Sequence, residues 1–163
     1  MKKAGFLIGL HKEQKLRIVE PSEEMKQAYI EKSSASMKSA EILLQNSLLE
    51  NSVPMVYYSM YNMLMALFFK VGIKCENHAA SIILLNELFG IENSKIEFAK
   101  KERVDKQYYA DFDISRKEVE NLISMTKEFN SSLYDFIDKL TNKDINTFKE
   151  KLRKMLKITS DSK

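Results

Sequence analysis

The fold is decided by residues 53–72, which read VPMVYYSMYNMLMALFFKVG. Only Ser59 and Asn62 interrupt the apolar character of residues 53–69. This run is shorter than the ~20 apolar residues of a membrane-spanning helix, and it contains a proline and three tyrosines. We therefore expect no membrane span, but the central helix of a bundle, covered on all sides and ended at Gly72.

The composition of the 163-residue chain permits long helices joined by few turns. It has four glycines and two prolines, too few for the many turns of a β-sandwich or barrel. Its one cysteine and two histidines exclude an internal disulfide and a multi-cysteine zinc site, and leave little for a histidine-built metal centre. We expect no metal and no cofactor. Such sparing use of cysteine is typical of the reducing cytoplasm, and the N-terminal apolar run lacks the cleavage site of a signal peptide.

Helical spacing and capping residues place further helices on both sides of the central one. Pro54 is tolerated in a first turn and Ser52 is a candidate cap for the central helix, whereas Asn77 is a candidate cap for the helix that follows it. Ser115 begins a capping box with Glu118. The other helices are expected from Pro21–Glu24 to about Leu49, then over residues 78–89, 94–107 and 115–140, with a last helix after Thr141-Asn142.

These elements predict an all-α fold, a bundle of five to six helices with a four-helix up-and-down core over residues 21–158. Residues 1–20 are expected to form an N-terminal arm or a short hairpin, because two apolar stretches flank a polar one. Residues 159–163 are expected to be a disordered tail.

The basic residues concentrate at the C-terminus. Residues 143–163 hold seven basic and three acidic side chains, an excess of four in a chain whose net charge is +3. An exposed basic helix binds phosphates in a salt-dependent way. We therefore expect that removing residues after Thr141 weakens polyanion binding without unfolding the bundle; the alternative is a solvated lysine-rich face that has no partner.

Polar chemistry gathers around the tyrosine-rich helix and the start of the next helix. Tyr57 and Tyr61 share one helical face, and Tyr58 and Asn62 share the neighbouring one. His78 lies at a helix N-terminus, where the positive end of the helix dipole disfavours the protonated imidazole. A neutral His78 would suit a general base or a phosphate-binding group; the alternative is a histidine that caps or packs.

A candidate nucleophile lies close to His78 in the sequence. Cys75, beside Lys74, is a further candidate, as a thiol of lowered pKa. The chain has no glycine-rich phosphate loop, HExxH, CxxC or nucleophile elbow.

At these residues the chain resembles the HEPN (higher eukaryotes and prokaryotes nucleotide-binding) domain. The resemblance rests on the run Val56–Leu67, on Gly72 and on Asn77-His78. It extends to residues 16–22, which are similar to the lead-in of a subfamily of small stand-alone prokaryotic proteins. It also includes Arg103-Val104-Asp105 with Tyr108-Tyr109, similar to that subfamily's arginine–aspartate–tyrosine segment.

The resemblance implies a helical bundle that dimerises through its central helices, often encoded beside a minimal nucleotidyltransferase as a toxin–antitoxin pair. Catalytic members of the family are metal-independent ribonucleases with an arginine followed a few residues later by a histidine. His78 matches that histidine, but no arginine precedes it at that distance; Lys74 and Lys70 are the nearest cations. The family's tyrosine two residues after the histidine is Ala80.

Three functions follow from these observations. The first is a non-catalytic partner of a minimal nucleotidyltransferase, homodimeric and cytoplasmic, that binds RNA or a nucleotide. The second is an endoribonuclease in which His78 is catalytic and a lysine, or Arg103 brought in from the later helix, holds the phosphate. The third is a helical protein-interaction module. The candidate ligand- and RNA-binding residues are Lys74, Asn77, Tyr58, Asn62 and Arg103.

Overall fold

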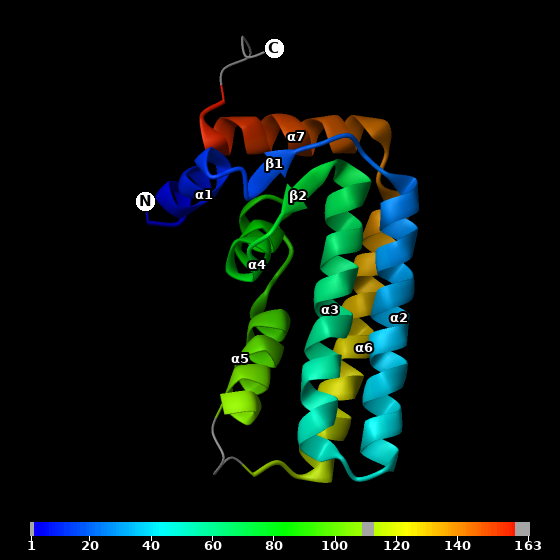
Figure 1. Cartoon of the computed structure of the whole chain (residues 1–163). Helices are drawn as coiled ribbons and strands as arrows, with labels where there is room; N and C mark the ends of the chain where they lie inside the picture. Colours follow the sequence, from blue (N-terminus) through cyan, green and yellow to red (C-terminus); the bar gives the residue numbers. More distant parts are fainter. Residues whose placement is uncertain (1, 109–112, 159–163) are drawn as a thin grey trace.

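A computed structural model describes residues 2–108 and 113–158 of the chain. Three long helices, α2, α3 and α6, lie side by side, and the shorter α5 runs along α3 (Figure 1). The short α4 lies above α5, and α7 crosses the end of the bundle next to α1 and a two-stranded sheet. The elements are α1 (Lys2–Lys12), β1 (Leu16–Ile18), α2 (Glu23–Gln45), α3 (Leu49–Val71), β2 (Ile73–Cys75), α4 (His78–Glu87), α5 (Ser94–Tyr108), α6 (Arg116–Lys139) and α7 (Asn142–Leu156).

The predicted all-α bundle is confirmed, with α2, α3, α5 and α6 as its up-and-down core. The described residues form seven helices and a two-stranded sheet, where five to six helices were predicted, because α1 was not recognised as a helix. α3 is the central helix, and most of its side chains are buried against α2, α5 and α6. Small residues on α2, among them Ser33 and Ala40, let α3 approach closely. The Ser33 and Ser59 hydroxyls each donate to the other residue's carbonyl oxygen, at 2.7 and 2.8 Å. The apolar circumference of α3 is thus covered within one chain and does not by itself require a second copy.

The start of α3 differs from the expectation. The helix begins at Leu49, and Ser52 lies inside it, where its hydroxyl donates to the Ala40 carbonyl oxygen of α2 at 2.7 Å. The prediction that Ser52 caps the helix is therefore wrong. Asn51 and Ser52, just before Val53-Pro54, suggested that the helix starts there, but the turn lies earlier, at Ser47, whose φ is +60°. Gly72 ends the helix as predicted, in the left-handed conformation that favours glycine.

The N-terminal segment is the largest departure from the sequence prediction. Residues 2–12 form a helix, α1, which buries Leu7 and Leu10 one turn apart, and not half of a hairpin. The strand that follows, β1, pairs antiparallel with β2, so that Leu16 lies opposite Cys75 and Ile18 opposite Ile73. The strand's partner is more than fifty residues away in the chain, beyond the reach of a local pattern.

The caps predicted for α4 and α6 are confirmed. The Asn77 side chain accepts from the Ala80 backbone N–H at 2.9 Å, and Ser115 with Glu118 forms the capping box of α6. Thr141 forms a second capping box, with Asp144, at the start of α7. The predicted tail at 159–163, and Tyr109 in the resemblance, lie outside the described residues. No helix in the described ranges is both long and apolar enough to cross a membrane.

Candidate functional site: a histidine among tyrosines with an arginine beside it

Three helices bring the candidate residues together. Tyr57 and Tyr61 lie one turn apart on α3, His78 is the first residue of α4, and Arg103 comes from the second half of α5. Because Asn77 caps α4, the backbone direction at the start of that helix is fixed and the imidazole is held against α3. We refer to Tyr57, Tyr58, Tyr61, His78 and Arg103 as the histidine cluster.

The His78 ring is fixed on two sides. Its Nδ1 lies 2.8 Å from the Tyr57 hydroxyl oxygen. Its plane stacks on Tyr61, with the ring centroids 3.8 Å apart and the planes at 14°. The hydrogen bond allows either tautomer: when Nδ1–H donates to Tyr57, the Nε2 lone pair is available as a base, and when Tyr57 donates, Nε2 carries the proton.

The surroundings of the cluster favour the neutral forms of its histidine and tyrosine side chains. Partial burial lowers the pKa of His78 below its usual 6.5, and the positive charges of Arg103 and Lys100 lower it further. Burial raises the pKa of Tyr61 to about 12 and also raises that of Tyr57, so both phenols stay protonated. At neutral pH the cluster therefore presents an uncharged imidazole beside a cation.

Arg103 is the cation of the cluster. Its guanidinium carbon lies 5.1 Å from the centroid of the Tyr57 ring and 5.7 Å from that of Tyr58, within the range of cation–π attraction. Its Nη1 donates to the Tyr58 hydroxyl at 3.3 Å. Its Nε is buried and finds no acceptor in the described part of the chain, where Arg103 also has no carboxylate partner. A buried N–H without an acceptor is costly, so the described residues do not use the full hydrogen-bonding capacity of Arg103.

The comparison with protein families fits this arrangement. The family model of the HEPN domain matches residues 26–135, about two thirds of the chain. The chain belongs to the HEPN domain family. The match spans the bundle from α2 into α6 and includes the whole histidine cluster, whereas α1, β1 and α7 lie outside it. No curated protein matches the chain.

Within this HEPN domain, the structure divides the predicted site residues into two groups. Tyr58, His78 and Arg103 lie together, and Asn77 supports them as a cap. Lys74 instead lies on β2 and pairs with Glu76 at 3.3 Å, and Asn62 contacts Ser36 of α2 at 3.4 Å. The structure therefore brings Arg103 to His78 and leaves Lys74 outside the cluster. Which of these side chains binds phosphate stays a prediction.

Lys100 was missed by the sequence analysis. It lies one turn before Arg103 on α5, and its charge reaches His78. The signal was present, because residues three apart on a helix share a face. The lowered pKa suggested for Cys75 by its position is wrong, because burial raises the pKa of its thiol. No group of His, Cys, Asp and Glu side chains in the described ranges is arranged to hold a metal ion.

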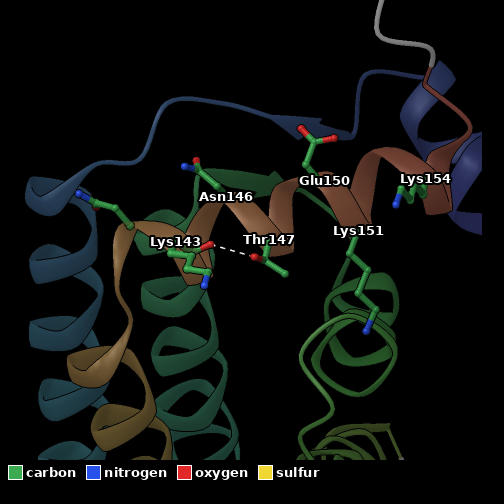
Figure 2. A pocket seen from close by; sticks show the side chains of 7 residues that line it. Lys143, Asn146, Thr147, Glu150, Lys151 and Lys154 are labelled. Atoms are coloured by element: carbon green, nitrogen blue, oxygen red, sulfur yellow. Dashed lines mark hydrogen bonds between the residues drawn. The ribbon is translucent and has the colours of Figure 1, made fainter.

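The basic C-terminal helix of this HEPN protein is integrated into the fold. Ile145, Leu152 and Leu156 of α7 are buried, so the prediction that α7 can be removed without unfolding the bundle is not supported by its packing. The side chains of α7 line an open groove of about 800 Å³. Figure 2 shows its lysines, with Lys151 extending toward α4. The Lys151 Nζ donates to the Leu88 carbonyl oxygen at 2.8 Å. Binding of a polyanion along this groove stays a prediction.

Proposed function

We propose that this HEPN protein binds a phosphate of RNA or of a nucleotide at the histidine cluster. Membership of the HEPN family implies a function related to nucleotides or RNA. The observation that supports the site is Arg103, whose guanidinium is oriented by Tyr57 and Tyr58 and whose buried Nε lacks an acceptor among the described residues.

The chemistry of the cluster suits a phosphodiester. A guanidinium offers several N–H donors in a planar fork that fits phosphate oxygens. Because no carboxylate among the described residues pairs with Arg103, its remaining donors stay available. Lys100 adds positive charge from the same helix face. The stacked rings of Tyr61 and His78 partly bury the imidazole beside these charges, and burial strengthens electrostatic attraction.

The cluster also has features that favour RNA cleavage as the second candidate function. A neutral His78 whose Nδ1–H donates to Tyr57 has a free Nε2 lone pair. That nitrogen would take the proton of a ribose 2′-hydroxyl, the 2′-oxygen would attack the adjacent phosphorus, and the bond to the departing 5′-oxygen would break. Arg103 would offset the charge that develops on the phosphate oxygens.

We favour binding over efficient cleavage. The arginine comes from α5 and is held by two tyrosines, and the family's arginine close before the histidine is missing. The resemblance to the subfamily of small stand-alone HEPN proteins supports two more specific proposals. One is that the protein is the partner of a minimal nucleotidyltransferase in a toxin–antitoxin pair, and the other is that it acts as a homodimer. The use of a single cysteine supports a cytoplasmic location.

The test is binding and cleavage of a short single-stranded RNA by the natural protein and by three variants. Arg103→Gln should weaken binding about tenfold or more, because a charge-assisted hydrogen bond is worth about 1.5–3 kcal/mol. Lys101→Gln is the matched control, since it removes one exposed charge from the same helix outside the cluster. His78→Ala decides between the candidates: cleavage by the natural protein that this variant loses would replace the binding proposal by the ribonuclease one.

Equal RNA affinity of the natural protein and Arg103→Gln would remove the support for the site. It would leave the protein-interaction module as the better reading.

A further inference from the structure

A polar cavity of about 440 Å³ lies at the end of the bundle, outside the histidine cluster. It is formed where the N-terminal segment meets α7, two parts of the chain that the HEPN match does not cover. Figure 1 shows β1 and the connection after it running along α7. The charged and titratable side chains that line the cavity are His11, Arg17, Glu20, Lys149 and Arg153.

Arg17 contributes an unsatisfied donor. The residue lies in the middle of β1, and its side chain is 38% exposed. Its Nη2 is 3.7 Å from a Glu76 oxygen, too long for a strong hydrogen bond, and its Nε is buried without an acceptor in the described ranges. The guanidinium is therefore partly held on one side and has donor capacity left over.

The charge of Lys149 is not paired within the described part of the chain. Its side chain passes Gly72, where an added Cβ would lie 3.0 Å from the lysine Cε, so the lysine stem lies against the end of α3. Lys149 forms no ion pair with the described residues. Arg153 pairs with Glu150 on its own helix. The Nδ1 of His11 is engaged with the Leu16 carbonyl oxygen at 2.9 Å, which leaves its Nε2 as a further hydrogen-bonding group.

The charge balance of the wall selects an anion. Three cationic side chains and one carboxylate, that of Glu20, line the cavity; Glu76 near Arg17 and Glu150 beside Arg153 lie outside the lining. Two of the cations are arginines, whose planar donor forks match phosphate oxygens. A group that carries two negative charges gains most from such a wall, and a terminal phosphate carries close to two at neutral pH.

We propose that this cavity binds a terminal phosphate group, supplied by a free mononucleotide or by the 5′ end of an RNA. Arg17 and Lys149 are the residues that would hold it, with Arg153 at its edge. The cavity shares no lining residue with the histidine cluster, so either site can fail without the other.

The experiment is a calorimetric titration of the full chain with inorganic phosphate and with adenosine monophosphate. Saturable binding is expected, weakened about tenfold or more in the double variant Arg17→Gln/Lys149→Gln. The matched control is Lys154→Gln, which removes a charge from the same helix but lines the other groove; we expect a change of about twofold at most. Glu20→Gln should strengthen binding, because it removes the one carboxylate of the wall.

Two further arms make the outcome decisive. Circular dichroism on heating shows whether the double variant is folded, and the gain in Glu20→Gln does not depend on that variant. RNA with a 5′-phosphate is compared with the same RNA ending in a 5′-hydroxyl. A preference for the phosphorylated end, lost in Arg17→Gln/Lys149→Gln and kept in Arg103→Gln, identifies the RNA end as the source; equal binding of both RNAs, with saturable nucleotide binding, identifies the free nucleotide.

Absence of saturable binding of both small probes at millimolar concentration would overturn the proposal. Unchanged affinity in the double variant, or an equal loss in Lys154→Gln, would overturn it as well.

Discussion

The histidine cluster and the cavity between the N-terminal segment and α7, here called the end cavity, each contain an arginine whose Nε finds no acceptor in the described chain. The surroundings of the two arginines differ. Arg103 lies between tyrosine rings and next to a neutral imidazole, inside the part of the chain that matches the HEPN family. Arg17 lies on an edge of a small sheet, 38% exposed and near Glu76, and the other cations of its cavity, Lys149 and Arg153, come from α7, outside the match.

The difference concerns how each arginine would hold a phosphate. Aromatic walls lower the local dielectric constant and orient Arg103, so the cluster is suited to positioning one phosphate against His78. In the end cavity several partly exposed cations together attract an anion, and a small anion of high charge gains most from them. Because these cations are partly exposed, dissolved salt screens this attraction. The predictions that follow separate the two regions, from the largest expected effect to the smallest.

The largest effect is expected from Leu152→Ala on α7. Leu152 is fully buried, and a buried leucine replaced by alanine costs about 2–5 kcal/mol of unfolding free energy. Chemical denaturation measures this directly. Because α7 forms one wall of the end cavity, phosphate binding there should weaken more than RNA binding at the histidine cluster. A loss below about 1 kcal/mol would mean that α7 is not packed as described.

The next effect is expected from Gly72→Ala, at the junction of α3 with β2. An added Cβ would lie 2.4 Å from the Val19 carbonyl oxygen, and the φ of +88° is itself unfavourable for alanine. We expect a loss of about 1–3 kcal/mol from the backbone conformation alone and more from the clash. Gly90→Ala is the control: its φ is +69°, but nothing lies within 4 Å of the added Cβ. Equal melting temperatures of the two variants would contradict the close approach of the Val19 carbonyl oxygen to Gly72.

A smaller effect is expected from Tyr57→Phe in the cluster. It removes the hydroxyl that lies 2.8 Å from His78 Nδ1 and leaves the packing of the ring in place. The expected cost is about 0.5–1.5 kcal/mol of unfolding free energy, the net value of one hydrogen bond. Tyr134→Phe, at an exposed position of α6, should cost nothing measurable. If the two variants unfold alike, the Tyr57–His78 hydrogen bond is not stabilising.

The smallest effect is a pH dependence that originates at His78. The folded chain binds a proton at His78 less readily than the unfolded chain, because the pKa is lowered by burial and by Arg103 and Lys100. The contribution to stability is therefore full above pH 6.5 and falls as the pH drops from 6.5 toward the folded pKa. His78→Gln should lose this part of the pH profile in denaturation experiments. A His78 imidazole signal that titrates above pH 6.5 by NMR would reverse the sign and contradict the account.

The comparison of sequence with structure shows where local patterns are sufficient. Capping residues such as Asn77 and Ser115, and the stop at Gly72, were predicted correctly because each acts within one turn of the backbone. The pairing of β1 with β2 was missed because it joins segments that are distant in the chain. Ser52 was misread as a cap because its hydroxyl serves a contact between helices, which no single helix reveals.

The candidate site was predictable in part for the same reason. His78 and the tyrosines of α3 were identified from the residue types and their spacing, but the cation beside them depends on how α5 packs across α3. The local pattern favoured Lys74 because it is close to His78 in the sequence, whereas Lys74 pairs with Glu76, which follows the end of its own strand. Packing between helices, not sequence distance, selects Arg103.

The most direct test of the phosphate-binding role of Arg103 is an NMR titration that follows the arginine Nε–H signals, assigned with Arg103→Lys and Arg17→Lys. A short RNA with a 5′-hydroxyl is added first, and inorganic phosphate is added in a second sample. We predict that the RNA shifts the Arg103 Nε–H signal saturably while that of Arg17 moves little, and that phosphate does the reverse. An Arg103 signal that stays unchanged while the chain binds the RNA would contradict the claim that this arginine takes the phosphate.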